Sequence, residues 1–172
     1  MLVRWAFRDD LTGLLNRRGF RLLAARRIRA AGRAGRTVVL FFVDLDGFKS
    51  INDAFGHAEG DRALARTAAS LKRTFRRTDV LARMGGDEFV ALVTENPRCS
   101  PAALCRRLQR NLARASVEES RYGLSLSIGV ASVEPETKPS LRRLLDAADL
   151  RLQHLKHARH AACDVGAHAA AR

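Results

Sequence analysis

Apolar residues recur along the chain at two different spacings, and the change of spacing separates predicted helices from predicted strands. Residues 18–34 have apolar side chains at helical intervals with arginines between them. This pattern predicts an amphipathic helix that ends between Gly32 and Gly35. Residues 37–43 are all β-branched or aromatic except for Leu40, which predicts a buried strand.

The remainder of the chain continues this alternation of helices and strands. In order, the sequence predicts a short helix at 48–55, a helix at 59–76 with Asp61 in its first turn, a hairpin with strands at 80–82 and 89–93, a helix from Pro101, a strand at 124–133 and a helix from Ser140. Residues 161–172 are alanine-rich and unpatterned, so we expect a frayed tail there. The order of elements predicts one α+β domain at 1–160, in which helices pack on the faces of a mixed sheet.

Composition narrows the class of protein. With 172 residues, of which 47% are hydrophobic, the chain has the size of one globular domain. The three cysteines form no CxxC pair, and the sequence has neither a secretory signal pattern nor an apolar run long enough to cross a membrane. We therefore expect a cytoplasmic protein without membrane contact. The net charge of +13 suits polyanionic ligands, although most of the arginines fit solvated helix faces equally well.

Two acidic turns carry the strongest chemical signal. Gly85-Gly86-Asp87-Glu88, called the signature turn below, lies between the two strands of the predicted hairpin. Asp44 and Asp46 follow the buried strand at 37–43. If the strands are neighbours, Asp44 and Asp87 meet at one edge of the sheet and offer the hard oxygen ligands that Mg²⁺ prefers. The alternative interpretation is that these acids only form turns.

The two turns and the segments around them resemble the GGDEF family of diguanylate cyclases, which condense two GTP molecules into cyclic di-GMP. The segments that carry the resemblance are residues 9–18, 44–53, 55–57, 60–61, 85–89, 126–131 and 148–149, together with Lys156. Several motifs in the family's order are more specific than any one of them. The resemblance implies a palm-like domain related to class III nucleotide cyclases, with a mainly antiparallel sheet flanked by helices.

The resemblance also implies a catalytic centre. Asp44, Asp87 and the backbone carbonyl of Leu45 match the positions that hold a pair of Mg²⁺ or Mn²⁺ ions in the family. Glu88 matches a residue that either helps to deprotonate the ribose 3′-hydroxyl or completes the metal shell, and the sequence leaves this choice open.

Five further positions match residues that bind GTP in the family. Lys49 and the backbone amides of Gly47 and Phe48 match contacts to the triphosphate. Asn52 and Asp61 match the residues that read guanine, whose N–H donors suit a carboxylate. Asp61 therefore favours GTP over ATP, although an isolated acid near a helix start is otherwise unremarkable.

The carboxyl-terminal motif departs from the family pattern. Lys156 matches a lysine that contacts the triphosphate, but Arg159 lies one place earlier than the usual arginine, and Gln153 replaces a usual tyrosine. Either Arg159 reaches the phosphates through a small change in the helix end, or the affinity for the triphosphate is reduced.

A product-inhibitory site is a further expectation from the resemblance. Arg76 and Asp79 form an RxxD sequence five residues before Gly85, where the family binds cyclic di-GMP, and Arg107 matches a supporting arginine. RxxD is common by chance in an arginine-rich chain, so a structural ion pair at a helix end is the alternative.

Partners follow from the same resemblance. A homodimer with two facing sites is needed to join two GTP molecules, and we expect an upstream sensor domain that is missing from this chain. The main alternative function is a non-catalytic receptor for cyclic di-GMP or GTP. Nucleic-acid binding ranks lower, because the sequence has no clear recognition motif and only one Trp and one Tyr for base stacking.

Overall fold

The structure, a computed structural model, describes residues 6–95, 100–117, 122–135 and 140–169, except for the side chains of residues 116–117 and 159–169. Its elements follow in the order α1 (Arg17–Arg33), β1 (Val38–Leu45), α2 (Phe48–Phe55), α3 (His57–Thr74), β2 (Val80–Gly85), β3 (Glu88–Thr94), α4 (Pro101–Val117), β4 (Leu126–Val133) and α5 (Leu141–Ala169). This order confirms the predicted succession of helices and strands.

The strands form one sheet in the order β2-β3-β1-β4. Each neighbouring pair is antiparallel, which agrees with the mainly antiparallel sheet that the family resemblance implies and not with the mixed sheet expected from the order of elements. Strand β1 lies inside the sheet, and all eight of its residues are buried. A strand that is covered on both faces reads as a continuous apolar run, which explains the pattern at residues 37–43.

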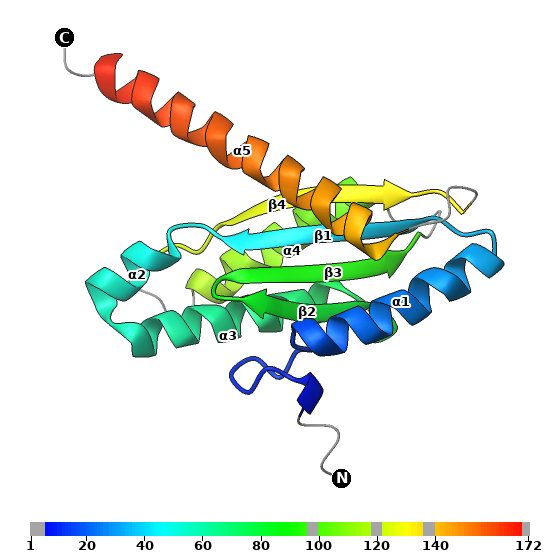
Figure 1. The fold of residues 1–172 in the computed structure, drawn as a ribbon. Coiled ribbons are helices and arrows are strands. Elements are labelled where there is room, and N and C mark those ends of the chain that lie inside the picture. Colours follow the sequence, from blue (N-terminus) through cyan, green and yellow to red (C-terminus); the bar gives the residue numbers. More distant parts are fainter. Residues whose placement is uncertain (1–5, 96–99, 118–121, 136–139, 170–172) are drawn as a thin grey trace.

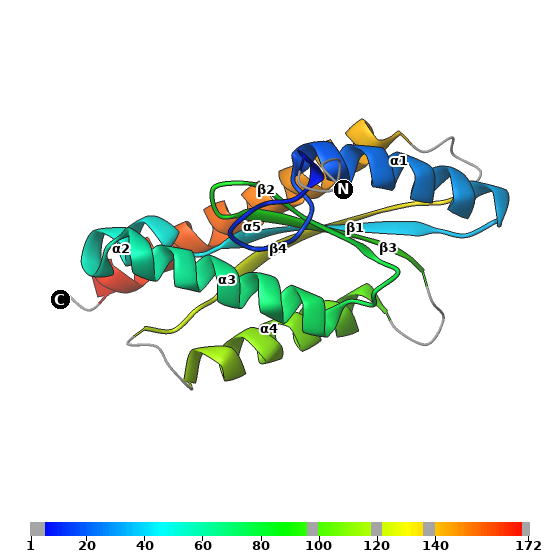
Figure 2. The ribbon, with the colours of Figure 1, turned by 90° about the horizontal axis from the view of Figure 1, so that it is seen from below.

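Helices cover both faces of the sheet and create two hydrophobic cores (Figures 1 and 2). Helices α1 and α5 pack on one face, where Phe20 and Leu144 meet Leu40 of β1. Helices α3 and α4 pack on the other face, where Leu64 and Leu108 meet Phe41 of β1. Successive residues of β1 therefore serve opposite cores, as the two-residue period of a strand requires.

The predicted start of α3 was wrong by two residues. The helix begins at His57, directly after Gly56, whose positive φ of 83° turns the chain between α2 and α3 within one residue. Glu59 is consequently the acid of the first turn, and Asp61 lies in the second. The presence of Asp61 is therefore not explained as an acid in the first turn of a helix.

Helix α5 passes over the sheet and extends beyond its edge (Figure 1). Its backbone stays helical to Ala169, whereas the sequence predicted a frayed tail from residue 161. Alanine has the highest helix propensity, so an alanine-rich segment continues a helix without a packing pattern. The domain end at residue 160 stays a prediction. Within the described ranges, none of the helices has the length and apolar character that crossing a membrane demands.

Candidate functional site

The hairpin and the central strand bring the predicted acids to one edge of the sheet. Gly85 pairs with Glu88, so the two central residues of the turn are Gly86, with a φ of 48°, and Asp87. Glu88 in turn pairs with Asp44 of β1. The amide of Leu45 donates to the carbonyl of Asp87 over 3.2 Å. The structure therefore brings Asp44, Asp87 and Glu88 to one edge of the sheet.

Asp44 and Glu88 lie on the sheet face that α1 and α5 cover. Residues at directly paired positions of antiparallel strands point to the same face, and Asp44 shares its face with Leu40 and Phe42, which pack in the core against α1 and α5. Helix α5 runs over this face, so its side chains can reach the acidic edge of the sheet.

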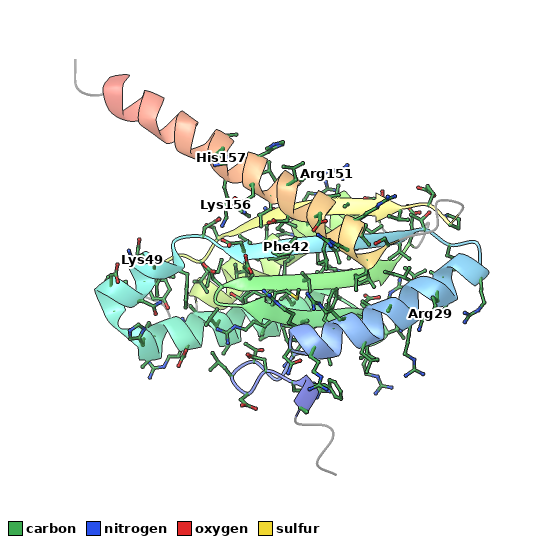
Figure 3. The ribbon with its side chains drawn as sticks, in the orientation of Figure 1. Arg29, Phe42, Lys49, Arg151, Lys156 and His157 are labelled. Atoms are coloured by element: carbon green, nitrogen blue, oxygen red, sulfur yellow. The ribbon has the colours of Figure 1, made fainter. Side chains whose placement is uncertain are left out.

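Lys156 of α5 forms an ion pair with Asp44. Its Nζ lies 2.7 Å from Oδ2 of Asp44, and the two side chains are 30% and 9% exposed. Figure 3 shows Lys156 on α5 and Lys49 on α2, on opposite sides of the β1–α2 connection. The sequence predicted Lys156 as a phosphate contact and gave no sign of this ion pair.

Burial and neighbouring carboxylates raise the pKa of Asp44 and of Glu88. Burial raises the pKa of Asp44, the charges of Asp87 and Asp46 add to the rise, and the contact with Lys156 opposes it. Burial also raises the pKa of Glu88, together with the charges of Asp44, Asp149 and Asp87, while Arg17 opposes the rise. Gathering negative charge in this way is unfavourable without a counter-ion, so the edge is suited to bind cations.

The donor set fits a hard divalent cation whose shell is completed by other oxygens. Among the described residues, no three acid, histidine or cysteine side chains form a ready-made ligand group. Magnesium commonly binds through one or two carboxylates plus phosphates and water, and Asp44 and Asp87 supply two such carboxylates. The ammonium of Lys156 places a positive charge next to Asp44, where a bound cation would also place one.

The connection between β1 and α2 is held by Asp46. Its carboxylate accepts hydrogen bonds from the hydroxyls of Ser125 at 2.8 Å and Ser127 at 2.6 Å, and its amide donates to the carbonyl of Ser125. Gly47 then begins α2 in the left-handed conformation, with a φ of 69°. Asp46 thereby fixes the position of the amides at the start of α2, where Lys49 is exposed to solvent.

The two predicted guanine-reading residues are brought together by contact between α2 and α3. Asn52 of α2 packs against Gly60, the residue before Asp61 in α3: a methyl group on Gly60 would lie 1.9 Å from Oδ1 of Asn52. Lys49 and Asn52 lie one turn apart on α2, as predicted. The resemblance included Gly60 in the motif at 60–61 but gave it no role; its missing side chain leaves room for the side chain of Asn52.

The predicted inhibitory residues also lie near one another. Asp79 accepts a hydrogen bond from the amide of Arg76 at 2.8 Å. Burial raises the pKa of Asp79, and the Arg76 hydrogen bond and the charges of Arg76, Arg27 and Arg107 oppose the rise. Arg107 donates from Nη2 to the carbonyl of Thr74. Its buried Nε has no hydrogen-bond partner in the part of the chain that the structure describes.

A basic hollow of about 540 Å³ adjoins this RxxD sequence. Arg8, Lys72, Arg76 and Arg77 line it together with Asp79, and the rest of its lining is mostly leucine and Phe75. Positive charge beside an apolar floor suits a ligand with phosphates and flat bases.

Several contributions to the site were not predicted. These are the ion pair between Lys156 and Asp44, the effect of Asp149 on Glu88, the support of Asp46 by two serines, and the packing of Gly60 on Asn52. Most of these residues belong to motifs of the resemblance, but the sequence gave no sign of the contacts that they make. The predicted phosphate contact of Arg159 lies outside the described side chains.

An antiparallel sheet covered by helices on both faces, with acidic residues at the edge where β1 ends and β3 begins, defines an α+β domain whose acidic edge suits a cation. Comparison with known proteins gives its family. Residues 6–162 match the family described as diguanylate cyclase, GGDEF domain. The chain belongs to the GGDEF family of diguanylate cyclases.

Curated relatives support this membership. The chain is 34% identical over 90% of its length to the bifunctional diguanylate cyclase/cyclic di-GMP phosphodiesterase MucR of Pseudomonas aeruginosa, of which it covers 23%. It is also 34% identical over 88% of its length to the probable diguanylate cyclase DgcC of Escherichia coli, of which it covers 41%. The chain thus spans less than half of these relatives.

Solved structures agree with the fold. The coiled coil and GGDEF domain of DgcB from Caulobacter crescentus, in complex with c-di-GMP, superposes with a TM-score of 0.80 at 26% identity, and the match covers 91% of this chain and 84% of that one. Another match, a sensory box/GGDEF family protein from the same organism, has a TM-score of 0.78 at 31% identity, covering 88% of this chain and 99% of the other.

Proposed function

We propose that this domain condenses two GTP molecules into cyclic di-GMP and releases two pyrophosphates. The observation that carries the proposal is the meeting of Asp44, Asp87 and Glu88 at one edge of the sheet, in a chain that belongs to the GGDEF family. The intact signature turn favours this function over that of a receptor that only binds nucleotide.

Different residues of the site are assigned to metal binding and to proton transfer. Asp44, Asp87 and the carbonyl of Leu45 are proposed to hold two Mg²⁺ or Mn²⁺ ions, which when bound neutralise the triphosphate and the developing charge at the reacting phosphate. Glu88, with its raised pKa, accepts the proton of the ribose 3′-hydroxyl or adds a metal ligand.

Substrate binding is assigned to α2 and the elements around it. The amides of Gly47 and Phe48 at the helix start, together with Lys49, bind phosphate oxygens. Asn52 and Asp61 read guanine. Lys156 leaves Asp44 and moves to the triphosphate when metal and nucleotide bind, and Arg159 supports it.

Two subunits are required because one site holds one GTP. In a head-to-head dimer, each 3′-hydroxyl attacks the α-phosphate of the nucleotide in the other subunit. Such a dimer allows a symmetric product to form by two identical steps. An upstream segment of a longer protein is proposed to bring the two domains together.

The decisive experiment incubates concentrated, nucleotide-stripped protein with GTP and Mg²⁺ and separates the products by chromatography. We expect cyclic di-GMP from the unaltered chain and at least a 100-fold lower rate from Glu88→Ala, since loss of a positioned proton acceptor commonly costs 10²–10⁴-fold. Glu95→Ala, which removes an exposed glutamate, serves as the control and should retain the activity. Absence of product from the unaltered protein at high concentration would contradict the proposal.

Product inhibition through Arg76, Asp79 and Arg107 is proposed from the basic hollow that Arg76 and Asp79 line and from the charge of Arg107 acting on Asp79. Arg76→Ala should raise the cyclic di-GMP concentration for half-inhibition by about tenfold or more, because a charged hydrogen bond contributes about 1.5–3 kcal/mol. Arg26→Ala, an exposed arginine on α1, is the control. Unchanged inhibition in Arg76→Ala would contradict this site. Tight uptake of cyclic di-GMP without any turnover of GTP would instead identify the domain as a receptor.

A further inference from the structure

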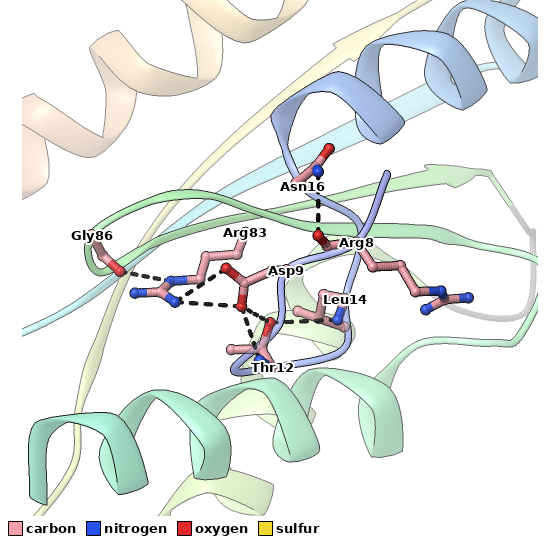
Figure 4. A network of polar contacts seen from close by, with 7 residues as sticks. All are labelled: Arg8, Asp9, Thr12, Leu14, Asn16, Arg83 and Gly86. Atoms are coloured by element: carbon pink, nitrogen blue, oxygen red, sulfur yellow. Dashed lines mark hydrogen bonds and ion pairs between the residues drawn. The ribbon is translucent and has the colours of Figure 1, made fainter. Parts of the chain in front are cut away.

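A hydrogen-bond network joins the amino-terminal loop to the signature turn (Figure 4). At its centre, the carboxylate of Asp9 accepts bonds from the amide of Thr12 at 2.9 Å and from the Thr12 hydroxyl at 2.6 Å. The same carboxylate lies 3.2 Å from Nη1 of Arg83 on β2. Asp9 and Arg83 are 74 residues apart in sequence, so this contact closes a long loop.

Arg83 continues the network into the signature turn. Its Nε donates to the carbonyl of Gly86 over 2.9 Å, so one guanidinium connects Asp9 to the turn residue that precedes Asp87. We call this connection the Asp9–Arg83–Gly86 bridge. The planar guanidinium has donors in a fixed fork and can hold two acceptors at once, whereas a lysine ammonium is a point charge.

The signature turn needs such support because its own strand pairing is irregular. The register of β2 against β3 shifts between Arg83 and Gly85, so regular pairing is interrupted just before the turn. Gly85 and Gly86 are exposed and have no side chains to pack. A second arginine, Arg17, donates from Nε to the carbonyl of Met84 within the irregular stretch.

The bridge is anchored on both sides. The side chains of Arg83 and Asp9 are only 16% and 22% exposed, so their ion pair is shielded from solvent. Burial acts to raise the pKa of Asp9, but the Thr12 bonds and Arg83 outweigh it and lower that pKa. Backbone bonds from Leu15 to Leu81 and from Arg83 to Leu15 fasten the loop to β2 beside the bridge.

We propose that Arg83 is a positioning residue for the cyclase reaction: the Asp9–Arg83–Gly86 bridge holds the signature turn so that Asp87 and Glu88 face Asp44. The bridge also makes the turn depend on the placement of the amino-terminal loop, through which an upstream segment would act. This inference rests on the proposed function, because its consequence is a rate of cyclic di-GMP formation. An error of about 1 Å in such a site can cost 100-fold in rate.

The test compares Arg83→Lys, Asp9→Asn and the control Arg29→Lys, which alters an exposed arginine on α1 (Figure 3). Lysine keeps the charge beside Asp9 but cannot hold Gly86 as well. We expect kcat of Arg83→Lys to fall about 10- to 100-fold per folded molecule, with KM for GTP changed less than about threefold. Asp9→Asn should have a smaller effect in the same direction, since asparagine keeps an acceptor for Thr12.

A second readout does not depend on activity. Amide hydrogen exchange of residues 84–89 should be faster in Arg83→Lys than in the unaltered chain and in Arg29→Lys, at equal global stability by chemical denaturation. Unchanged exchange there overturns the bridge, whether or not the protein is a cyclase. Faster exchange with kcat within twofold of the unaltered chain overturns the positioning role. If the unaltered protein shows no turnover, the proposed function is wrong. The exchange measurement then still tests whether the bridge holds the signature turn.

Discussion

At the scale of single residues, the acids at the edge of the sheet lower the stability of the cation-free domain. The structure gathers Asp44, Asp87 and Glu88 where β1 ends and β3 begins, and burial and neighbouring carboxylates raise the pKa of Asp44 and Glu88. A folded domain without bound cations therefore keeps these acids ionised at a free-energy cost.

Glu88→Gln should accordingly stabilise the cation-free protein at neutral pH. Because the folded pKa of Glu88 is raised, the folded state binds more protons than the unfolded state above the usual pKa of about 4.3, and stability falls as pH rises through this window. Glutamine removes this cost, so the melting temperature should rise at pH 7.5 and match the unaltered chain below about pH 4. Thermal unfolding at both pH values, with the exposed Glu95→Gln as control, measures the difference. A less stable variant at pH 7.5 would contradict the interpretation.

The contact of Lys156 with Asp44 predicts competition with metal ions. Lys156→Met removes an ammonium from the cation position, so Asp44 should bind Mn²⁺ more tightly in the absence of nucleotide, while binding of the triphosphate weakens. A partly exposed ion pair contributes up to about 1 kcal/mol, which corresponds to a roughly fivefold gain in Mn²⁺ affinity. Mn²⁺ titration by electron paramagnetic resonance gives the affinity. Lys49→Met, which keeps the ion pair, should leave nucleotide-free binding unchanged.

At the scale of elements, the position of α5 on β4 sets the distance between Lys156 and the acidic edge. The two elements touch at Gly129, where a Cβ would lie 2.0 Å from the carbonyl of Ala148 and 2.6 Å from the amide of Leu152. Both are backbone atoms of a helix, so they cannot move without moving α5 itself. Asp149 and Lys156 lie on this helix and would move with it.

Gly129→Ala should therefore destabilise the domain and displace α5. Overpacking typically costs about 1–3 kcal/mol, and here the clash is with backbone atoms, so we expect the upper end of that range. Chemical denaturation measures the loss, and activity should fall with it. Gly123→Ala is the matched control, since a Cβ there meets no atom within 4 Å. Equal stability of the two variants would contradict the close contact between α5 and Gly129.

At the scale of the whole molecule, one domain offers one acidic edge and one proposed GTP site. Turnover per subunit should then depend on protein concentration, since the proposed reaction needs two subunits. We expect the specific activity to fall on dilution through the dimer dissociation range, as monitored by analytical ultracentrifugation or light scattering. Constant activity over a range that includes complete dissociation would contradict the dimeric mechanism.

Most of the fold was predictable from local pattern. The continuous apolar run of β1, the helical spacing of α1 and the glycine turn of the hairpin each depend on neighbouring residues, and each element was confirmed. The misplaced start of α3 and the helical course of α5 to Ala169 have local causes too, in the conformation of Gly56 and the propensity of alanine.

The sequence by itself determined the order of the elements, the two acidic turns and, through its motifs, the family. Only the tertiary structure decided that Lys156 pairs with Asp44, that Asn52 packs against Gly60 and that Arg83 joins Asp9 to Gly86. Spacing along a chain controls contacts within a helix or a hairpin, because these involve residues a few positions apart. Contacts between distant segments depend on how the helices pack on the sheet, and no local pattern encodes which side chains meet there.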